Sequence, residues 1–201
     1  MNRYLQNKFN PDANSSVGVT AKVTSYTSEQ HDNQTYKVQI WDSSGQDRFH
    51  KTVSSYFRNA DGVCVVFDLT DYQSYMDLRD WITDVRHANR DKEGMPFIIV
   101  GNKLDLCEAN AHGNERQIDP EDAAQLAETY GIDFYETSAK SGENVREMLI
   151  NLIEKSISYT VEEFYRKLAE IQADELMDGQ GGDNPRHSAS FKINSVNFSV
   201  D

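Results

Sequence analysis

The chain has 201 residues, which suits one domain followed by a short tail. Its formal net charge of −13 argues against nucleic acid or anionic lipid as a general partner, because both require basic surface. No apolar run approaches the roughly 18 residues that a membrane-spanning helix needs. Cys64 and Cys107 are too few for a disulfide framework or a zinc site, so we expect a reducing, cytoplasmic compartment.

The first part of the chain has the pattern of a short helix followed by two strands. Residues 1–9 resemble the end of a helix, and residues 10–16 have the composition of a turn. Residues 20–27 and 35–41 alternate with the period of two that is typical of half-buried strands. The polar stretch 28–34 joins them, so we expect a hairpin.

Two continuous apolar runs follow, at residues 61–69 and 96–100. Such runs are typical of strands that are buried on both faces of a parallel sheet. Between them, apolar side chains recur at helical spacing and predict a helix that covers the sheet. These side chains are Tyr75, Leu78, Ile82 and Val85.

The second half of the chain continues this alternation of strands and helices. Residues 120–130 have a helical pattern with Asp119 as the expected cap, and residues 132–135 have the pattern of a short strand. A long helix begins near Glu143. The alternation predicts an α/β fold, with a mostly parallel sheet and helices on both of its faces.

The periodic pattern stops near the end of the long helix. Glycine, proline and polar residues then dominate, so we expect a domain over residues 1–172 and a mostly disordered tail over residues 173–201. An alternative is that the end of this tail forms a short recognition strand, because its apolar residues alternate weakly with polar ones. These apolar residues are Phe191, Ile193, Val196, Phe198 and Val200.

The strand at residues 35–41 ends in a D-x-x-G-Q motif made by Asp42, Gly45 and Gln46. In nucleotide-binding α/β folds the ligand lies beyond the carboxyl ends of the strands. There Asp42 would hold Mg²⁺ directly or through water, because this cation prefers carboxylate oxygen. Gly45 would let its backbone N–H approach a γ-phosphate, and Gln46 would orient an attacking water. The alternative is an ordinary polar turn after a strand.

The strand at residues 96–100 is followed by Asn102, Lys103 and Asp105 in an N-K-x-D arrangement. The Asp105 carboxylate can accept two hydrogen bonds from adjacent N–H groups on one edge of guanine, a pair that adenine lacks. The aliphatic stem of Lys103 can lie across the base plane, and Asn102 can tie neighbouring loops together. The alternative is a capped loop with solvated charges.

Ser138, Ala139 and Lys140 follow the strand at residues 132–135. A small residue at position 139 would let a backbone N–H reach the guanine carbonyl, and Lys140 would cover the base from the other side. The three motifs occur in this order, each just past an apolar strand. Together they are a far stronger signal than any one of them alone.

With these motifs the chain resembles the Ras-like small GTPases, and specifically the Rab branch, over about residues 1–170. The resemblance implies a Ras-like P-loop GTPase fold, binding of GTP, GDP and Mg²⁺, and hydrolysis of GTP to GDP and phosphate. It also implies nucleotide-dependent contacts with effectors, exchange factors and GTPase-activating proteins in vesicle-mediated transport. The family acts on endomembranes.

The resemblance also implies roles for single residues. Ser16 and Asp42 would serve Mg²⁺, and Gln46 would position the water that attacks GTP. Ser16 stands where the family has a threonine and keeps the hydroxyl. The residues that would contact the nucleotide are Gly45, Asn102, Lys103, Asp105, Ser138, Ala139 and Lys140.

The chain departs from the family pattern in two places. The sequence contains no G-x-x-x-x-G-K-[ST] phosphate loop, and in this fold the strand before that loop lies between the strands at 35–41 and 61–69. We therefore expect a sheet that lacks its first strand, in a chain that is a fragment, an alternative product or a truncated gene model. Such a chain should show no cooperative unfolding above about 45 °C. The second departure is the absence of a prenylation cysteine near residue 201.

Two functions are consistent with these residues. The first is a Rab-like guanine nucleotide switch. The second is a nucleotide-free module, or a non-functional fragment, that keeps the effector-facing surface and binds partners without switching. That surface comprises Ile40, Trp41, Phe49, Tyr56 and Phe57.

Overall fold

The computed structural model describes residues 1–11, 19–43, 57–107, 115–177 and 195–200. The helices are α1 (Asn2–Gln6), α3 (Tyr72–Ala88), α4 (Pro120–Tyr130) and α5 (Val145–Met177), with a 3₁₀ turn at η2 (Leu104–Leu106). The strands are β1 (Val19–Ser28), β2 (Gln34–Ser43), β3 (Gly62–Asp68), β4 (Phe97–Asn102), β5 (Asp133–Glu136) and β6 (Ser195–Val200). This order confirms the predicted α/β class.

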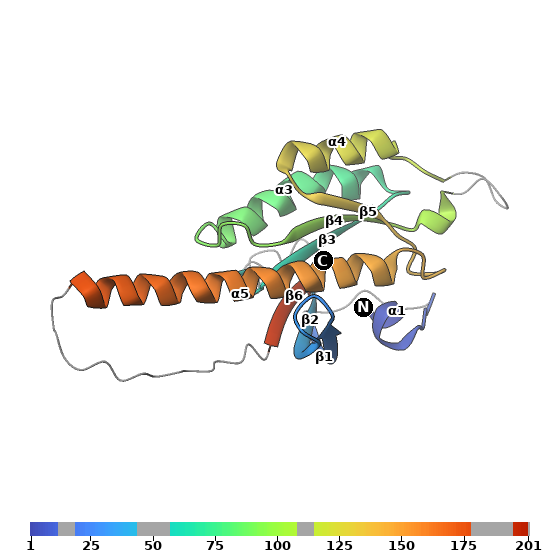
Figure 1. The fold of residues 1–201 in the computed structure, drawn as a ribbon. Helices are drawn as coiled ribbons and strands as arrows, with labels where there is room; N and C mark the ends of the chain where they lie inside the picture. The colour runs from blue at the N-terminus through green and yellow to red at the C-terminus, as the bar shows by residue number, and fades with distance from the viewer. Residues whose placement is uncertain (12–18, 44–56, 108–114, 178–194, 201) are drawn as a thin grey trace.

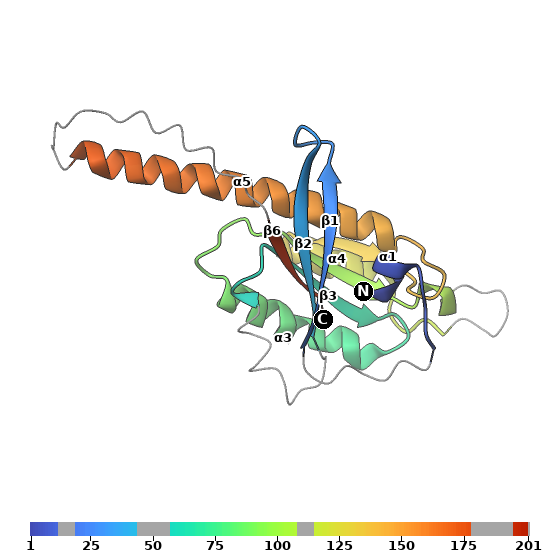
Figure 2. The same ribbon diagram turned by 90° about the horizontal axis from the view of Figure 1, so that it is seen from below.

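The strands form one sheet in the order β1-β2-β6-β3-β4-β5. β1 and β2 pair antiparallel, which confirms the predicted hairpin, and the other neighbours pair in parallel. Figure 1 shows α3 and α4 on one face of the sheet and α1 and α5 on the other. In Figure 2 the β1–β2 hairpin projects from the sheet. The expected cover of both faces by helices is therefore confirmed.

Each face of the sheet carries its own apolar core. On the face covered by α3, Val65 and Phe67 of β3 belong to a buried cluster with Ile82. On the face covered by α5, Cys64 of the same strand belongs to a second cluster with Leu152. β3 thus buries both of its faces, which explains why its sequence carries no charge before Asp68 at its end.

Two helices begin at aspartate caps. The Asp71 carboxylate accepts a hydrogen bond from the Gln73 backbone N–H at 3.0 Å, at the start of α3. The Asp119 carboxylate accepts from the Glu121 N–H at 2.9 Å, at the start of α4. α4 ends at Tyr130 and is capped by Gly131, which has a φ of 63° and so adopts the left-handed conformation that favours glycine. The predicted cap at Asp119 is confirmed.

The last helix extends well beyond the sheet. Leu152 and Ile157 of α5 are buried, whereas Tyr165 and Ile171 further along are 64% and 56% exposed. Figure 1 shows this second part of α5 projecting from the body. Among the described residues, no helix is both long enough and apolar enough to cross a bilayer.

The structure differs from the expected tail and from the expected gap in the sheet. α5 continues to Met177, and residues 195–200 form β6 instead of disordered chain. β6 lies between β2 and β3, where the family resemblance predicts the strand that this sequence lacks. The physical reason is that neighbouring interior strands need backbone partners, and an alternating segment near the end of the chain supplies them. The remainder of the tail lies outside the described residues.

A buried carboxylate connects the β1–β2 hairpin to α5. Glu154 is only 7% exposed. It accepts hydrogen bonds from the Tyr26 hydroxyl at 2.5 Å and the Ser28 hydroxyl at 2.7 Å. The His31 ring lies 3.5 Å from the same carboxylate and contacts the Ser158 hydroxyl at 3.3 Å. Burial and the bond to Glu154 raise the pKa of the Tyr26 phenol, which therefore stays neutral and donates.

Replacing Glu154 by alanine should lower the free energy of unfolding by about 2–3 kcal/mol, because the hydroxyls of Tyr26 and Ser28 lose their acceptor. Urea unfolding of the full chain, followed by circular dichroism, measures the change. Glu162→Ala, at an exposed position of the same helix, is the matched control and should change stability by less than about 0.5 kcal/mol. Equal midpoints for the two variants would contradict the role given to Glu154.

Candidate functional site

Two turns meet at the carboxyl edge of the sheet. β4 and β5 pair in parallel, with Gly101 opposite Glu136 at their ends, so the segments that follow them start side by side. The Thr137 backbone N–H donates to the Gly101 carbonyl at 2.8 Å. The Leu104 N–H donates to the Thr137 carbonyl at 3.0 Å. These main-chain bonds fix the turn after β4 against the turn after β5.

The side chains of the two predicted motifs contact one another across these turns. Asn102 Oδ1 accepts a hydrogen bond from the Ala139 backbone N–H at 3.0 Å, so Asn102 does tie the loops together. The Ser138 hydroxyl donates to Asp105 Oδ1 at 2.6 Å. The Lys140 ammonium lies 3.4 Å from Asp105 Oδ2. The structure thus brings five of the predicted residues into one constellation.

The backbone N–H of Ala139 differs from expectation in one respect. The sequence places this N–H where it would reach a guanine carbonyl, whereas in the structure it donates to Asn102. The turn of Ser138 to Lys140 is thereby held to β4 without a ligand. A guanine carbonyl would have to share this donor with the Asn102 side chain.

Lys103 is held by a carboxylate that the sequence analysis did not single out. Its backbone is left-handed, with a φ of 69°, and its ammonium lies 2.5 Å from Asp68 Oδ2. Burial of Asp68 works against ionisation, but hydrogen bonds from Lys103 and Thr70 hold the pKa of this carboxyl below its usual value. Asp68 is the last residue of β3, just as Asn102 is the last residue of β4. This position at a strand end is the sequence signal that could have identified Asp68.

Asp105 presents a carboxylate that is constrained yet accessible. Its side chain is 17% exposed. Its two oxygens are bound by Ser138 and Lys140, but a carboxylate has about four lone-pair positions. Two further N–H donors can therefore approach it from the open side. A ligand edge with two adjacent donors matches this arrangement.

An arginine near the start of the chain supports the second turn. The Arg3 guanidinium donates from Nε to the Ala139 carbonyl at 2.7 Å and also donates to the Lys140 carbonyl. It donates further to Asn7 Oδ1 at 3.0 Å, at the end of α1. α1 is thus attached directly to the turn after β5. No local pattern marks Arg3, because the contact joins residues far apart in sequence.

Asp42 lies at the carboxyl end of β2, at the same edge of the sheet. Burial raises the pKa of its carboxyl above the usual value, against the opposing effect of the N-terminal ammonium and Lys22. Asp42 of β2 and Cys64 of β3 are both opposite Val200 of β6, so they lie at the same level of the sheet. β3 continues for four more residues, to Asp68. From strand spacing and rise, Asp42 is therefore roughly 15 Å from the end of β3.

The other residues predicted near Asp42 lie outside the described residues. These are Ser16, Gly45 and Gln46. Within the described ranges, no three His, Cys, Asp or Glu side chains are grouped so that they could hold a metal ion. Asp42 is the predicted Mg²⁺ residue that the structure places.

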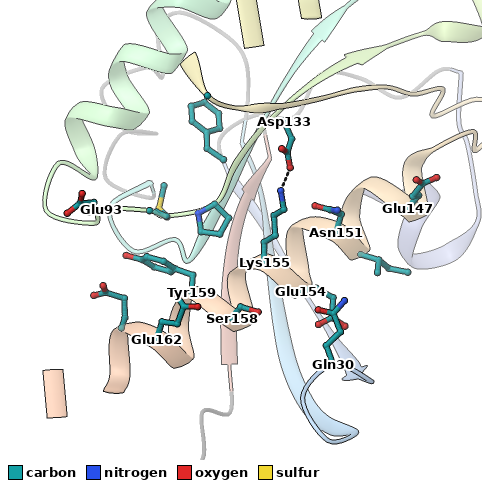
Figure 3. A pocket seen from close by; sticks show the side chains of 17 residues that line it. Gln30, Glu93, Asp133, Glu147, Asn151, Glu154, Lys155, Ser158, Tyr159 and Glu162 are labelled. Carbon is teal, nitrogen blue, oxygen red and sulfur yellow. Dashed lines mark hydrogen bonds and ion pairs between the residues drawn. The ribbon is translucent and has the colours of Figure 1, made fainter. Parts of the chain in front are cut away.

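A separate cavity of about 900 Å³ lies at the opposite edge of the sheet. Its wall includes Phe97 and Asp133, which begin β4 and β5, and the side of α5 that carries Asn151. Figure 3 shows the Lys155 ammonium directed at the Asp133 carboxylate in this cavity. Because it adjoins the amino ends of the strands, the cavity is not part of the constellation around Asp105.

The chain is similar to known proteins over most of its length. The model of the Ras family matches residues 1–158. The Ras-related protein Rab-27B of Rattus norvegicus is 36% identical over an alignment of 170 residues that covers 80% of this chain and 75% of the relative. Rab-8B of Homo sapiens is 36% identical over 151 residues, which are 75% of this chain and 67% of the relative.

A third relative is more similar over a shorter stretch. The Ras-related protein Rab-1D of Dictyostelium discoideum is 40% identical over 139 residues, which are 69% of this chain and 62% of the relative. The family match covers the hairpin, both strand-end turns and the first part of α5. The family match and these relatives show that the chain belongs to the Ras family as a Rab-like small GTPase, and the two joined turns agree with this.

Proposed function

We propose that the two strand-end turns bind the guanine base of GDP and GTP, and that the chain acts as a guanine nucleotide switch. The observation that carries this proposal is the Asp105 carboxylate, which Ser138 and Lys140 hold in place. Asn102 holds the neighbouring turn by its bond to the Ala139 N–H. The acceptor is therefore fixed before a ligand arrives, which reduces the cost of binding.

The base is selected by hydrogen bonds to Asp105. Guanine presents two adjacent donors, the ring N1–H and the exocyclic amino group, and both match the oxygens of one carboxylate. Adenine has no donor at N1, so its binding would leave the carboxylate without those partners, at a cost of about 1–3 kcal/mol. The nucleotide specificity of the chain thus depends on one side chain.

Lys103 and Lys140 lie on either side of the proposed position of the base in sequence order, one in each turn. The Lys103 ammonium is held by Asp68, and the Lys140 ammonium by Asp105. Because each ammonium is fixed at its end, the aliphatic stem is restrained as well and is available to cover a flat ring. This supports the proposed contacts of both lysines with the base.

Asp42 fits a role at the phosphate end of the nucleotide. It is a partly buried carboxylate roughly 15 Å from the end of β3, a separation that leaves room for a sugar and a chain of phosphates. A single carboxylate suits Mg²⁺, which is usually bound through one or two carboxylates, water and substrate phosphates. Ser16 would add a hydroxyl ligand, Gly45 would approach the γ-phosphate, and Gln46 would orient water for GTP hydrolysis.

The family resemblance supports a proposal for the cellular role. Because Rab-27B, Rab-8B and Rab-1D are Ras-related Rab proteins, we propose that this chain acts in vesicle-mediated transport at endomembranes, as the Rab resemblance implies. Effectors, exchange factors and GTPase-activating proteins would bind at the switch regions. Of the residues expected on the partner-binding surface, Ile40 and Phe57 are each only 1% exposed and so lie in the core, whereas Trp41 is half-buried.

A second candidate is the nucleotide-free, effector-binding module. The observation that favours it is that the site is satisfied without a ligand, since Ala139 N–H and the Asp105 oxygens already have partners within the chain. In that case the partner-binding surface would be constant. The two candidates differ in whether purified protein binds guanine nucleotide at all.

The first prediction concerns the base. The full chain should bind GDP more tightly than IDP by about tenfold, because IDP lacks the exocyclic amino group that donates to Asp105. Asp105→Ala should remove this preference, so that the ratio of the two dissociation constants approaches one. Isothermal titration with GDP, IDP and ADP measures the ratios.

Asp91→Ala is the matched control for this experiment, because Asp91 is an exposed carboxylate away from the turns. It should keep the preference for GDP. Equal binding of GDP and ADP by the unmodified chain would refute guanine recognition. Absence of binding to every nucleotide would favour the module.

The second prediction concerns Mg²⁺. In the unmodified chain, Mg²⁺ should tighten GDP binding by about tenfold or more relative to EDTA, because Asp42 would help to hold a cation that offsets the charge of the phosphates. Asp42→Asn keeps the size of the side chain but removes its charge, and should reduce this gain several-fold. The ratio is taken within each variant, so a change in overall stability cancels. An undiminished gain in Asp42→Asn would show that Asp42 does not serve the metal.

A further inference from the structure

The centre of the sheet contains a strand from the far end of the sequence. β6 lies between β2 and β3 and is parallel to both. Figure 1 and Figure 2 show it, in red, beside β2. Its register with β2 runs from Lys37↔Ser195 to Asp42↔Val200. Its register with β3 is shorter, from Gly62↔Phe198 to Cys64↔Val200. β6 thus connects the half of the sheet with the hairpin to the half with β3, β4 and β5.

We propose that the space between β2 and β3 is a strand-acceptor slot for an extended, uncharged peptide, and that residues 195–200 of the same chain are its resting occupant. The slot is lined by buried strands. Val38 and Ile40 of β2 and Val63 of β3 are each at most 1% exposed. Backbone N–H and C=O groups at such depth need partners, and β6 provides them on both sides.

The sequence of the occupant suits this position. Residues 195–200 contain no charge and no proline, and they include Val196, Phe198 and Val200. Valine and phenylalanine favour strands, and a proline would remove a backbone donor. α5 contacts both β3 and β6, so the helix covers the strand on one face of the sheet.

The length of the chain allows the occupant to come from the same molecule. α5 runs from Ile157, which is buried in the core, to Met177, a distance of about 30 Å. Residues 178–194 can span up to about 55–60 Å when extended. The segment can therefore return along the helix to the sheet. A second copy of the chain is the alternative donor, and the experiments below distinguish it.

Replacement of β6 by another peptide is favoured because β6 pairs with fewer residues of β3 than of β2. β6 is in register with six residues of β2 but only three of β3. Opening on the β3 side breaks the shorter ladder first. A peptide of the same sequence can then compete for the slot by strand addition, in which main-chain hydrogen bonds supply most of the affinity.

A proline in the strand tests the slot in the full chain. Ser199 is opposite both Trp41 and Val63, so Ser199→Pro removes a donor and fixes φ at a position with neighbours on both sides. Ser188→Pro, outside β6, is the matched control. Amides of β2 and β3 should exchange with deuterium at least roughly tenfold faster in Ser199→Pro than in the control. Equal exchange in the two variants would overturn the proposal.

The same variant tests exchange of the occupant. A fluorescein-labelled peptide of residues 193–201 should bind Ser199→Pro at least about tenfold more tightly than it binds the unmodified chain, whose slot is filled. It should also restore the slow exchange of β2 and β3. A peptide that itself carries the proline should do neither. Equal binding of the peptide to both chains, or binding to neither, would refute the slot.

A disulfide cross-link tests whether residues 195–200 of the same chain fill the slot, and it does not rely on a destabilised variant. Position 200 is opposite Cys64, and neighbouring strand positions have Cα atoms close enough for a disulfide. Val200→Cys, oxidised with diamide, should therefore form a link to Cys64 within one chain. Ser199→Cys is the control, because successive strand positions face opposite sides of a sheet.

Peptide mapping by mass spectrometry under non-reducing conditions locates the link. A link to Cys64 within monomers of Val200→Cys, absent in Ser199→Cys, supports the proposal. A link between two chains would mean that the strand comes from a second copy and would overturn the assignment to the same chain. No link to Cys64, or equal links in both variants, would also overturn it. These readouts need no nucleotide, so they are independent of the proposed switch.

Discussion

The parallel pairing of β4 with β5 is the constraint on which the candidate site depends. It places Gly101 opposite Glu136, so the two chemically distinctive turns begin at one edge of the sheet. Gly101 itself is part of this constraint. A Cβ at that position would lie 2.6 Å from the end of the Leu69 side chain, so a larger residue would force Leu69 or the strand end to move. Glycine at position 101 thus lets β4 pack closely against the buried Leu69 just before Asn102.

Local bonds then convert this register into a fixed constellation. Asn102 and Ser138 act between the turns, and Arg3 adds a contact from α1. Through Arg3 the site is joined to the helix nearest the start of the chain. β6 lies between β2 and β3 and so connects the strand that ends near Asp42 to the strand that ends at Asp68. Both ends of the proposed nucleotide site therefore depend on segments from the two extremes of the sequence.

The sequence predicted what is encoded locally. The hairpin, the helix cap at Asp119 and the apolar strands are local signals, and the structure contains each of them. The contact of Arg3 with Ala139 was missed because it joins residues far apart in the chain, whereas the pairing of Lys103 with Asp68 was missed although Asp68 stands at a strand end. The sequence also indicated that a strand was needed between β2 and β3. The alternation near the end of the tail indicated a short strand as an alternative, but a need for backbone partners does not specify which segment meets it, so the place of residues 195–200 between β2 and β3 was not predicted.

The distribution of charge at this edge separates two parts of nucleotide binding. Lys103 pairs with Asp68 and Lys140 with Asp105, so each cation beside the proposed base position is balanced by a carboxylate. A guanine ring is neutral, and its recognition there rests on hydrogen bonds. The phosphates of GDP are anionic and approach a chain with a net charge of −13, which repels them unless a cation intervenes. We therefore expect the turns to determine which base binds, whereas a divalent cation at Asp42 would determine how tightly the phosphates are held.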